Sequence, residues 1–418
     1  MRGKFLSCLL IMAVAASMIL VGFIPQVQAA EKKEIVFGGS LGLSGTFAEI
    51  SRHIKDSFEL WFEDTNKAGG IYVKKYGRKL PVRWIVYDDQ SDPGIGSKLM
   101  EKLITGDKVD FVTAPFSSGI TFPQTTVAEK HKKIIISYCG SSNEIFTRGF
   151  DYTFDHIGLA GSHFSPAIDL INHLEPRPEG IAIVASKELY TLTVAEASKR
   201  QLKDLGFDVV LYEEIPVGVK DASSIINKMK ALDVDVFLGC VLNPATALFT
   251  KQMKALNCRP KMIDFVQGSE MGWYIKEFGK YAEGIMGKFP AYADPKDPMI
   301  IEFTKRIKEK DPTWPLKTCD AVYHCQPYDT CEMIRQGVEA TGSLDNTKIA
   351  EWLRTHEIPG MLQGIGHKAK FQDYDNYKNI NVNITGVVCQ NQHGEPVVVW
   401  PPEYAAAKYL YPLGPWQK

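Results

Sequence analysis

The sequence predicts an α/β protein built from two doubly wound lobes, each with a parallel-rich central sheet. Short, continuously apolar runs alternate with amphipathic stretches of ten or more residues, a pattern typical of parallel strands covered by helices on both faces. The alternation restarts near residue 180, and a chain of 418 residues exceeds what one hydrophobic core usually supports. No low-complexity linker separates the halves, so we expect the chain to cross between the lobes more than once.

The elements of the first half follow this alternation. The predicted strands are Glu34–Leu41, Leu80–Asp88, Val109–Thr113 and Lys133–Tyr138. The helical patterns between them are Arg52–Lys67, Pro93–Thr105 and Ile120–Lys130. Each strand is too short and too uniformly apolar to be a surface helix, which favours a buried parallel sheet.

The second half repeats the pattern. Its predicted strands are Gly180–Ala185, Phe207–Tyr212, Val234–Gly239 and Lys261–Val266, with helices at Leu192–Leu205, Ala222–Leu232 and Pro244–Asn257. The remainder is irregular: strands are expected at Ala282–Pro290, Lys368–Gln372, Ile380–Gln390 and Val397–Trp400, and helices at Pro298–Lys310, Asp329–Thr341 and Thr347–Thr355. The Pro- and aromatic-rich tail after Trp400 is expected to pack along a surface in extended form.

The first thirty residues have the composition of a secretory signal peptide. Arg2 and Lys4 precede an apolar run from Leu9 to Ile24, and small residues then offer a cleavage site before Glu31. We expect residues 1–30 to be removed and the product to be periplasmic or otherwise extracytoplasmic. The alternative is an uncleaved membrane anchor, for which the apolar run is of marginal length.

The composition excludes several classes of partner. The formal net charge of −1 comes with no basic stripe and no basic amphipathic helix, so neither nucleic acid nor a membrane surface is expected. After residue 30 the chain holds an odd number of cysteines: Cys139, Cys240, Cys258, Cys319, Cys325, Cys331 and Cys389. Disulfides and buried free thiols both remain open. No metal-ligand spacing is present, and we expect neither a metal nor a cofactor.

One enzyme motif does occur. Gly38-Gly39-Ser40-Leu41-Gly42 matches the G-x-S-x-G turn that exposes the nucleophile of α/β-hydrolases. That turn normally follows several strands, whereas this match lies on the first strand of the mature chain. Nucleotide-binding glycine loops and helical zinc motifs do not occur in the sequence. We therefore expect no catalytic residues, with a hydrolase as the alternative that the motif leaves open.

Hydroxyl-rich loops follow the predicted strands. Ligands of doubly wound folds bind at the carboxyl ends of the strands, where loops lead into helix N-termini. Ser117, Ser118, Ser141 and Ser142 lie on such loops in the first half and could together hold a carboxylate. Glu270 follows the last strand of the second run and could receive an ammonium group. A carboxylate site facing an anion describes an α-amino acid, although each serine alone is more simply a helix cap.

The order and spacing of short motifs resemble a known family. The matching segments include Leu43-Ser44-Gly45, Asn66-Lys67-Ala68-Gly69-Gly70-Ile71, Tyr87-Asp88-Asp89-Gln90-Ser91-Asp92-Pro93, Ser117-Ser118 and Gly268-Ser269-Glu270. In this order they resemble the leucine/isoleucine/valine-type periplasmic binding proteins, the receptor components of branched-chain amino-acid ABC transporters. The match is specific in the N-terminal half and looser beyond Pro290.

The resemblance implies a type I periplasmic binding fold, whose two lobes are joined by three crossovers and close on a ligand in the cleft. Residues 31–156 with 288–378 would form lobe 1, and 157–287 with 379–418 lobe 2. It implies that Ser118 and Ser141 hold the ligand carboxylate. The carbonyl of Cys139 and the carboxylate of Glu270 would then hold its ammonium. Tyr190 and Tyr323 would be aromatic residues of the pocket.

The side-chain pocket departs from the family pattern. Phe116 stands where a smaller aliphatic residue is usual, and the family's disulfide beside the serine loop is absent. The resemblance implies a branched-chain, hydrophobic or aromatic amino acid as the ligand, ABC permease subunits as partners and a monomeric protein. The alternatives are a non-amino-acid solute (an aromatic acid, an amide, urea or a short peptide) or a ligand-sensing receptor subunit.

Overall fold

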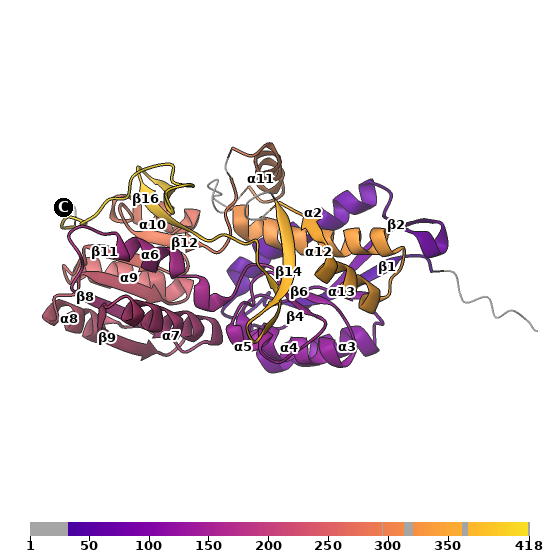
Figure 1. Ribbon diagram of the computed structural model, residues 1–418, viewed down its shortest axis with the longest axis horizontal. Coiled ribbons are helices and arrows are strands. Elements are labelled where there is room, and N and C mark those ends of the chain that lie inside the picture. Colours follow the sequence, from indigo (N-terminus) through magenta and orange to yellow (C-terminus); the bar gives the residue numbers. More distant parts are fainter. Residues whose placement is uncertain (1–31, 295, 313–320, 362–366, 417–418) are drawn as a thin grey trace, which may run out of the picture. The chain divides into compact units, whose positions relative to one another are not determined.

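The computed structural model describes residues 32–294, 296–312, 321–361 and 367–416, and the elements within them belong to one compact unit, Glu34–Lys418. The predicted signal peptide lies outside the described residues. None of the described helices is long and apolar enough to cross a membrane. Figure 1 shows two groups of strands with their helices within this unit. We call them lobe 1 and lobe 2.

Lobe 1 contains the three-stranded sheet β4-β1-β5, the five-stranded sheet β13-β14-β15-β7-β6 and the hairpin β2-β3. Its strands are β1 (Ile35–Leu41), β2 (Ile71–Val73), β3 (Arg78–Leu80), β4 (Val82–Asp88), β5 (Phe111–Val112), β6 (Ile135–Ser137), β7 (Thr153–Asp155), β13 (Glu357–Pro359), β14 (Lys368–Tyr374) and β15 (Tyr377–Asn381). Its helices are α2 (Ala48–Lys67), η1 (Lys74–Tyr76), α3 (Pro93–Thr105), α4 (Ser118–Lys130), α5 (Asn143–Phe146), α11 (Pro298–Lys310), α12 (Ala321–Thr341) and α13 (Asn346–Thr355).

Lobe 2 is built on one seven-stranded sheet of order β17-β16-β12-β11-β10-β8-β9. Its strands are β8 (Gly180–Ser186), β9 (Asp208–Ile215), β10 (Val236–Cys240), β11 (Met262–Phe265), β12 (Met286–Phe289), β16 (Val387–Gln392) and β17 (Glu395–Trp400). Its helices are η2 (Ala160–Ser162), α6 (Ser165–Asn172), α7 (Leu189–Asp204), α8 (Ser223–Ala231), α9 (Asn243–Ala255), α10 (Gly272–Phe278) and η3 (Gly279–Tyr281). Strands β9, β8, β10, β11 and β12 are parallel, and β16 and β17 add an antiparallel edge.

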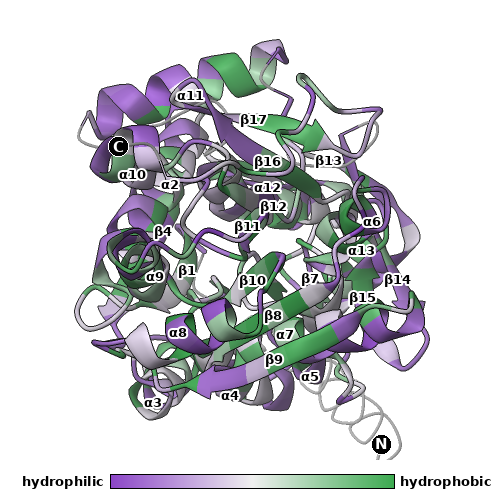
Figure 2. Cartoon of the chain, turned by 90° about the vertical axis from the view of Figure 1, so that its left-hand side faces the viewer, coloured by the Kyte–Doolittle hydropathy of each residue, from purple (hydrophilic) through white to green (hydrophobic). Residues whose placement is uncertain are grey.

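The sheet of lobe 2 is apolar on both faces. Along β8, Ile181 and Ile183 pack into one core cluster with α6 and α7, while Ala182 and Val184 pack into another with α8, α9 and α10. Figure 2 shows β8 as hydrophobic along its length. Alternate side chains of one strand thus enter opposite layers, which is why its sequence is continuously apolar rather than alternating.

The chain passes between the lobes three times: between β7 and β8, between β12 and β13, and between β15 and β16. Two α/β lobes with three crossovers confirm the predicted fold class. The division of the chain between the lobes stays a prediction, and strand pairing bears on two of its boundaries. Pairing on β12 keeps lobe 2 through Phe289, and pairing of β15 with β7 keeps lobe 1 through Asn381.

Three expectations about elements are wrong. The predicted strand Ile380–Gln390 is two strands in different sheets, because the Asn381 side chain bonds the backbone at Lys370, His156 and Asn383 and ends β15 there. Strand β6 pairs with β7 rather than with the first three strands. Helix α12 begins at Ala321 instead of Asp329 and contains Pro327 within its length, although proline usually stands at a helix start.

The Pro- and aromatic-rich tail lies against lobe 2. Residues 401–416 contain no helix or strand and attach to lobe 2 through hydrogen bonds such as Leu413 N–H to Lys261 O and Trp416 Nε1–H to Cys258 O. The six described cysteines form no disulfide with one another, and Cys319 lies outside the described residues. Five of the six are buried and Cys139 is partly exposed.

Candidate functional site

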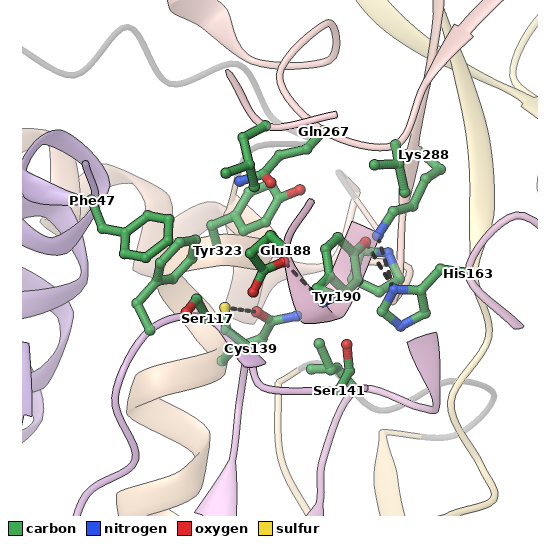
Figure 3. Close-up of a pocket in the computed structure, with 16 residues that line it drawn as sticks. Phe47, Ser117, Cys139, Ser141, His163, Glu188, Tyr190, Gln267, Lys288 and Tyr323 are labelled. Carbon is green, nitrogen blue, oxygen red and sulfur yellow. Dashed lines mark hydrogen bonds between the residues drawn. The ribbon is translucent and has the colours of Figure 1, made fainter. Parts of the chain in front are cut away.

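A pocket lies between the carboxyl ends of strands from both lobes, the place where ligands of doubly wound folds bind. Lobe 1 lines it with Phe47, Phe116, Ser117, Cys139, Ser141, Tyr323 and Gln326. Lobe 2 lines it with His163, Glu188, Tyr190, Leu242, Val266, Gln267 and Lys288. Ile157 and Pro290, from two of the crossovers, complete the lining. Figure 3 shows side chains from the two lobes converging on one space.

On lobe 1, two of the four predicted serines line the pocket. Ser117 caps helix α4 at a backbone φ of 75°, and Ser141 is fully buried with no hydrogen-bond partner for its hydroxyl among the described residues. We call Ser117 and Ser141 the serine wall. A buried, unpaired hydroxyl costs free energy, so a ligand acceptor at Ser141 would satisfy it.

The other two serines hold the loops together. The Ser118 hydroxyl accepts the N–H groups of Ser141, at 3.1 Å, and Ser142, at 3.0 Å. The Ser142 hydroxyl bonds Thr193 of lobe 2, at 2.7 Å. Neither Ser118 nor Ser142 lines the pocket. Of the carboxylate contacts expected from the sequence, the structure brings Ser117 and Ser141 to the cavity and leaves Ser118 and Ser142 beside it.

The serine wall depends on a close approach of two backbones. A Cβ atom at Gly140 would lie 2.3 Å from Oγ1 of Thr121 on helix α4, which only glycine avoids. The Thr121 hydroxyl in turn donates to the Ser117 carbonyl at 2.7 Å. Gly140 therefore sets Ser141 against the start of α4.

Lobe 2 presents charged and ionisable side chains. His163 Nε2 lies 3.0 Å from the Gly158 carbonyl, which can only accept, so Nε2 carries the proton and Nδ1 is an acceptor. Nδ1 then accepts from the Tyr190 hydroxyl at 3.1 Å and from the Lys288 ammonium at 3.2 Å. Burial and the charge of Lys288 hold the pKa of His163 well below its usual value, in agreement with a neutral ring.

Lys288 lies on β12 with only 3% of its surface exposed. Burial lowers its pKa, and the charges of Glu270 and Asp264 act in the opposite direction. Its ammonium also lies over the Tyr190 ring, 5.6 Å from the centroid. We call Lys288, His163 and Glu188 the charged wall.

Glu188 connects the two lobes. One carboxylate oxygen caps helix α7 by accepting the N–H groups of Tyr190 and Thr191, at 2.8 and 3.3 Å. The other accepts the N–H of Gly119 in α4 at 3.2 Å. Burial raises the pKa of Glu188, and these three backbone donors oppose the shift. Both oxygens are thus engaged before a ligand enters.

Glu270 does not line the pocket. It is fully buried, and its Oε1 accepts the Tyr323 hydroxyl at 2.8 Å. Burial raises the pKa of Glu270, while the Tyr323 hydroxyl and the Lys288 charge favour the ionised carboxylate. Tyr323 itself lines the pocket. Direct contact of Glu270 with a ligand ammonium remains a proposal.

The apolar part of the pocket is aromatic. Phe116 and Phe47 contact each other edge to face, with ring centroids 5.3 Å apart, and both line the cavity. Cys139 lies beside them, and its thiol donates to Gln326 Oε1 at 3.8 Å. Burial raises the pKa of that thiol, so it remains neutral.

The family model for periplasmic binding proteins matches residues 34–381, most of the chain. The chain belongs to the periplasmic binding protein family. A leucine-, isoleucine-, valine-, threonine- and alanine-binding protein of Pseudomonas aeruginosa is 27% identical to it over 366 residues, covering 86% of this chain and 92% of the relative.

Two solved structures share the fold of this periplasmic binding protein. A putative branched-chain amino acid ABC transporter protein from Silicibacter pomeroyi has a TM-score of 0.74 at 17% identity, covering 91% of this chain and 99% of the other. An ABC transporter solute-binding protein from R. palustris in complex with benzoate has a TM-score of 0.74 at 17% identity, covering 90% and 98%.

The G-x-S-x-G motif serves the structure of this binding protein. Ser40 is 1% exposed; its hydroxyl donates to Asp89 at 2.8 Å and accepts from Gln124 at 2.7 Å. The two glycines before it give close backbone packing: a Cβ at Gly39 would lie 1.9 Å from Thr113 Oγ1. A nucleophile must be reachable by substrate, and Ser40 is not.

Within the part of the chain that the structure describes, one group of metal-type ligands lies apart from the pocket. Ligand atoms of His53, Asp56 and Asp311 lie within 4.8 Å of one another. His53 Nδ1 and Asp311 Oδ2 are 2.6 Å apart, so an ion pair or hydrogen bond within the protein accounts for their proximity.

Three residues of the charged wall were missed by sequence reasoning. Lys288 had a visible signal, since it interrupts the apolar strand predicted at Ala282–Pro290. Glu188 precedes a helix start, where an acidic side chain can cap. His163 carried no signal, because it lies in a crossover loop whose path depends on the packing of both lobes.

Proposed function

We propose that this chain is the extracytoplasmic solute-binding component of an ABC importer and captures a small, amino-acid-like carboxylate by lobe closure. The observation that carries the proposal is one pocket lined from both lobes, with a buried, unpaired Ser141 hydroxyl beside the start of α4. Hydroxyls and N–H groups at a helix start attract carboxylates. A ligand that contacts both lobes favours the closed arrangement because it binds that arrangement better than the open one.

The ligand class we propose first is a hydrophobic or aromatic amino acid, because the P. aeruginosa relative is named for amino acids and the pocket is lined by Phe47 and Phe116. The alternative is an acid without an amine, which is favoured by the position of Lys288 and by the benzoate in the R. palustris structure. In either case the bound protein would dock on permease subunits, and binding alone would be its activity.

A thermal-shift screen of the mature protein tests the proposal. Amino acids, aromatic acids and amides are added at increasing concentration, and a true ligand at about 100 times its Kd should stabilise the fold by ~2.7 kcal/mol. The matched control is the variant Ser117→Ala/Ser141→Ala, which should respond less. If carboxylates leave the melting temperature unchanged while amides or urea raise it, the proposed carboxylate site is wrong.

A further inference from the structure

Lys288 is the only lysine among the described residues that line the pocket, and arginine is not among them. Contacts with neighbouring side chains fix the position of its ammonium. The Lys288 ammonium donates a hydrogen bond to the unprotonated Nδ1 of His163 at 3.2 Å and lies over the Tyr190 ring. Only 3% of the residue is exposed to water. A cation buried in this way needs compensating charge.

That charge comes from the neighbours of the ammonium. Burial raises the pKa values of Glu270, Asp264 and the Cys139 thiol, and the charge of Lys288 opposes the shift in all three. A Cβ atom at Gly287, the residue before Lys288, would lie 2.9 Å from Glu270 Cβ, so the strand that carries the lysine packs directly on Glu270. The charge of Lys288 therefore already acts on the carboxylate that an amino-acid ammonium would need.

Glu188 is the carboxylate that lines the pocket, and backbone donors engage it. Both oxygens of Glu188 accept backbone N–H groups, one from Gly119 of α4 and one from the first turn of α7. Both oxygens of Glu188 are thus engaged. Oε2 of Glu270 has no hydrogen-bond partner among the described residues, but Glu270 does not line the pocket. A ligand ammonium would bring a second positive charge next to Lys288 in a buried space, and like charges in such a space destabilise each other.

We infer that Lys288 determines specificity by standing where an amino-acid ligand would place its own ammonium. The site then selects carboxylic acids with an apolar or aromatic body and no free α-amine. Among the described residues, the lining carries one lysine and one carboxylate, Glu188, which already accepts three backbone N–H groups. The ligand carboxylate would pair with Lys288, while the serine wall supplies uncharged donors. This inference rests on the proposed capture of a carboxylate and, of the two ligand classes proposed above, selects the acid without an amine over the amino acid.

Matched ligand pairs test the inference by calorimetric titration. Each pair has the same body with and without the amine: leucine against 4-methyl-2-oxopentanoate, and phenylalanine against 3-phenylpropanoate, with benzoate added. The expected result is heat of binding from the amine-free member alone. Lys288→Met should weaken that binding by at least about tenfold and gain binding of the amino acids, since Glu270 then lacks its cation. Lys251→Met, an exposed lysine paired with Glu277, is the control and should bind like the unmodified protein.

Two further variants separate folding from specificity. If Lys288→Met fails to fold, Lys288→Arg should fold and keep the preference for acids. Glu270→Gln should also keep it, whereas a Glu270 that received the ligand ammonium would lose binding in this variant. Binding of the amino acids alone, or equal binding of both pair members, overturns the inference and leaves the proposed carboxylate capture standing. Binding of neither member, at millimolar concentration, overturns both.

Discussion

The serine wall and the charged wall line the same cavity with different chemical groups. Ser117 and Ser141 are uncharged and lie on loops at the start of one helix, so short segments of sequence indicate them. Lys288, His163 and Glu188 come from a strand, a crossover and a helix cap, and they meet only through tertiary packing. The comparison teaches that the residue types of the serine wall are visible in loop sequences, whereas those of the charged wall are not grouped in any one loop. The final position of both walls depends on tertiary packing, through Gly140 and Ser118 in lobe 1 and through neighbouring strands in lobe 2.

The largest effect should come from the serine wall. In Ser117→Ala/Ser141→Ala, two hydrogen bonds to a charged ligand group are lost, each contributing ~1.5–3 kcal/mol, so we expect Kd to rise by about a hundredfold or more. Isothermal titration measures this change with whichever carboxylate binds the unmodified protein. Ser142→Ala is the control, because its hydroxyl bonds Thr193 and does not line the pocket. Equal weakening in the control would mean that the loops, rather than their hydroxyls, carry the binding.

A substitution in the charged wall should lower the free energy of unfolding as well as the ligand affinity. His163→Phe removes the acceptor of both Tyr190 and Lys288 and leaves a buried ammonium less satisfied, at a cost of ~1–3 kcal/mol in unfolding free energy. Urea unfolding measures it. His173→Phe is the control, since His173 is exposed. If both variants unfold at the same urea concentration, the network around His163 does not position Lys288.

The sequence predicts the lobe architecture well because strand and helix patterns are local. Gly180–Ala185 was expected as a buried strand, and β8 is Gly180–Ser186. The serine loops were also placed correctly, since capping chemistry depends on adjacent residues. Local patterns could not predict which serines line the pocket and which hold the loops together. Ser118 bonds Ser141 and Ser142, which lie more than twenty residues away in the sequence.

The same limit applies to Glu270. An acidic residue after a strand end favours a role at the cavity. Nothing in the local sequence indicates that Tyr323, 53 residues away, donates a hydrogen bond to Oε1 of Glu270. The split of the predicted strand Ile380–Gln390 has a similar origin, because Asn381 ends β15 through bonds to distant backbone groups. Long-range hydrogen bonds, rather than propensity, decide these cases.

A buried carboxyl without a cation offers a contrast with Glu270. Asp155 at the end of β7 is fully buried, and burial raises its pKa to about 8, opposed only by backbone N–H groups. The unfolded chain releases this proton near pH 4 and the folded chain keeps it, so stability should fall as pH rises from about 4 to about 8. Asp155→Asn should remove that loss. Relative to the unmodified protein, the variant should gain ~1.4 kcal/mol per pH unit within this window, measured by urea unfolding at pH 5, 6, 7 and 8. A constant difference across these pH values would show that Asp155 titrates normally in the folded state.

The smallest effect should come from the hydroxyl of Tyr190, which bonds His163 of the charged wall. Tyr190→Phe keeps the ring under the Lys288 ammonium and removes only the hydrogen bond to His163 Nδ1. A neutral hydrogen bond contributes ~0.5–1.5 kcal/mol, so ligand affinity and stability should each change by no more than about tenfold and ~1.5 kcal/mol. Tyr190→Leu is the paired variant, because it removes the ring as well and should weaken binding further. If Tyr190→Phe matched His163→Phe in both readouts, the hydroxyl rather than the imidazole would fix Lys288. The charged wall would then be organised from helix α7 instead of from the first crossover.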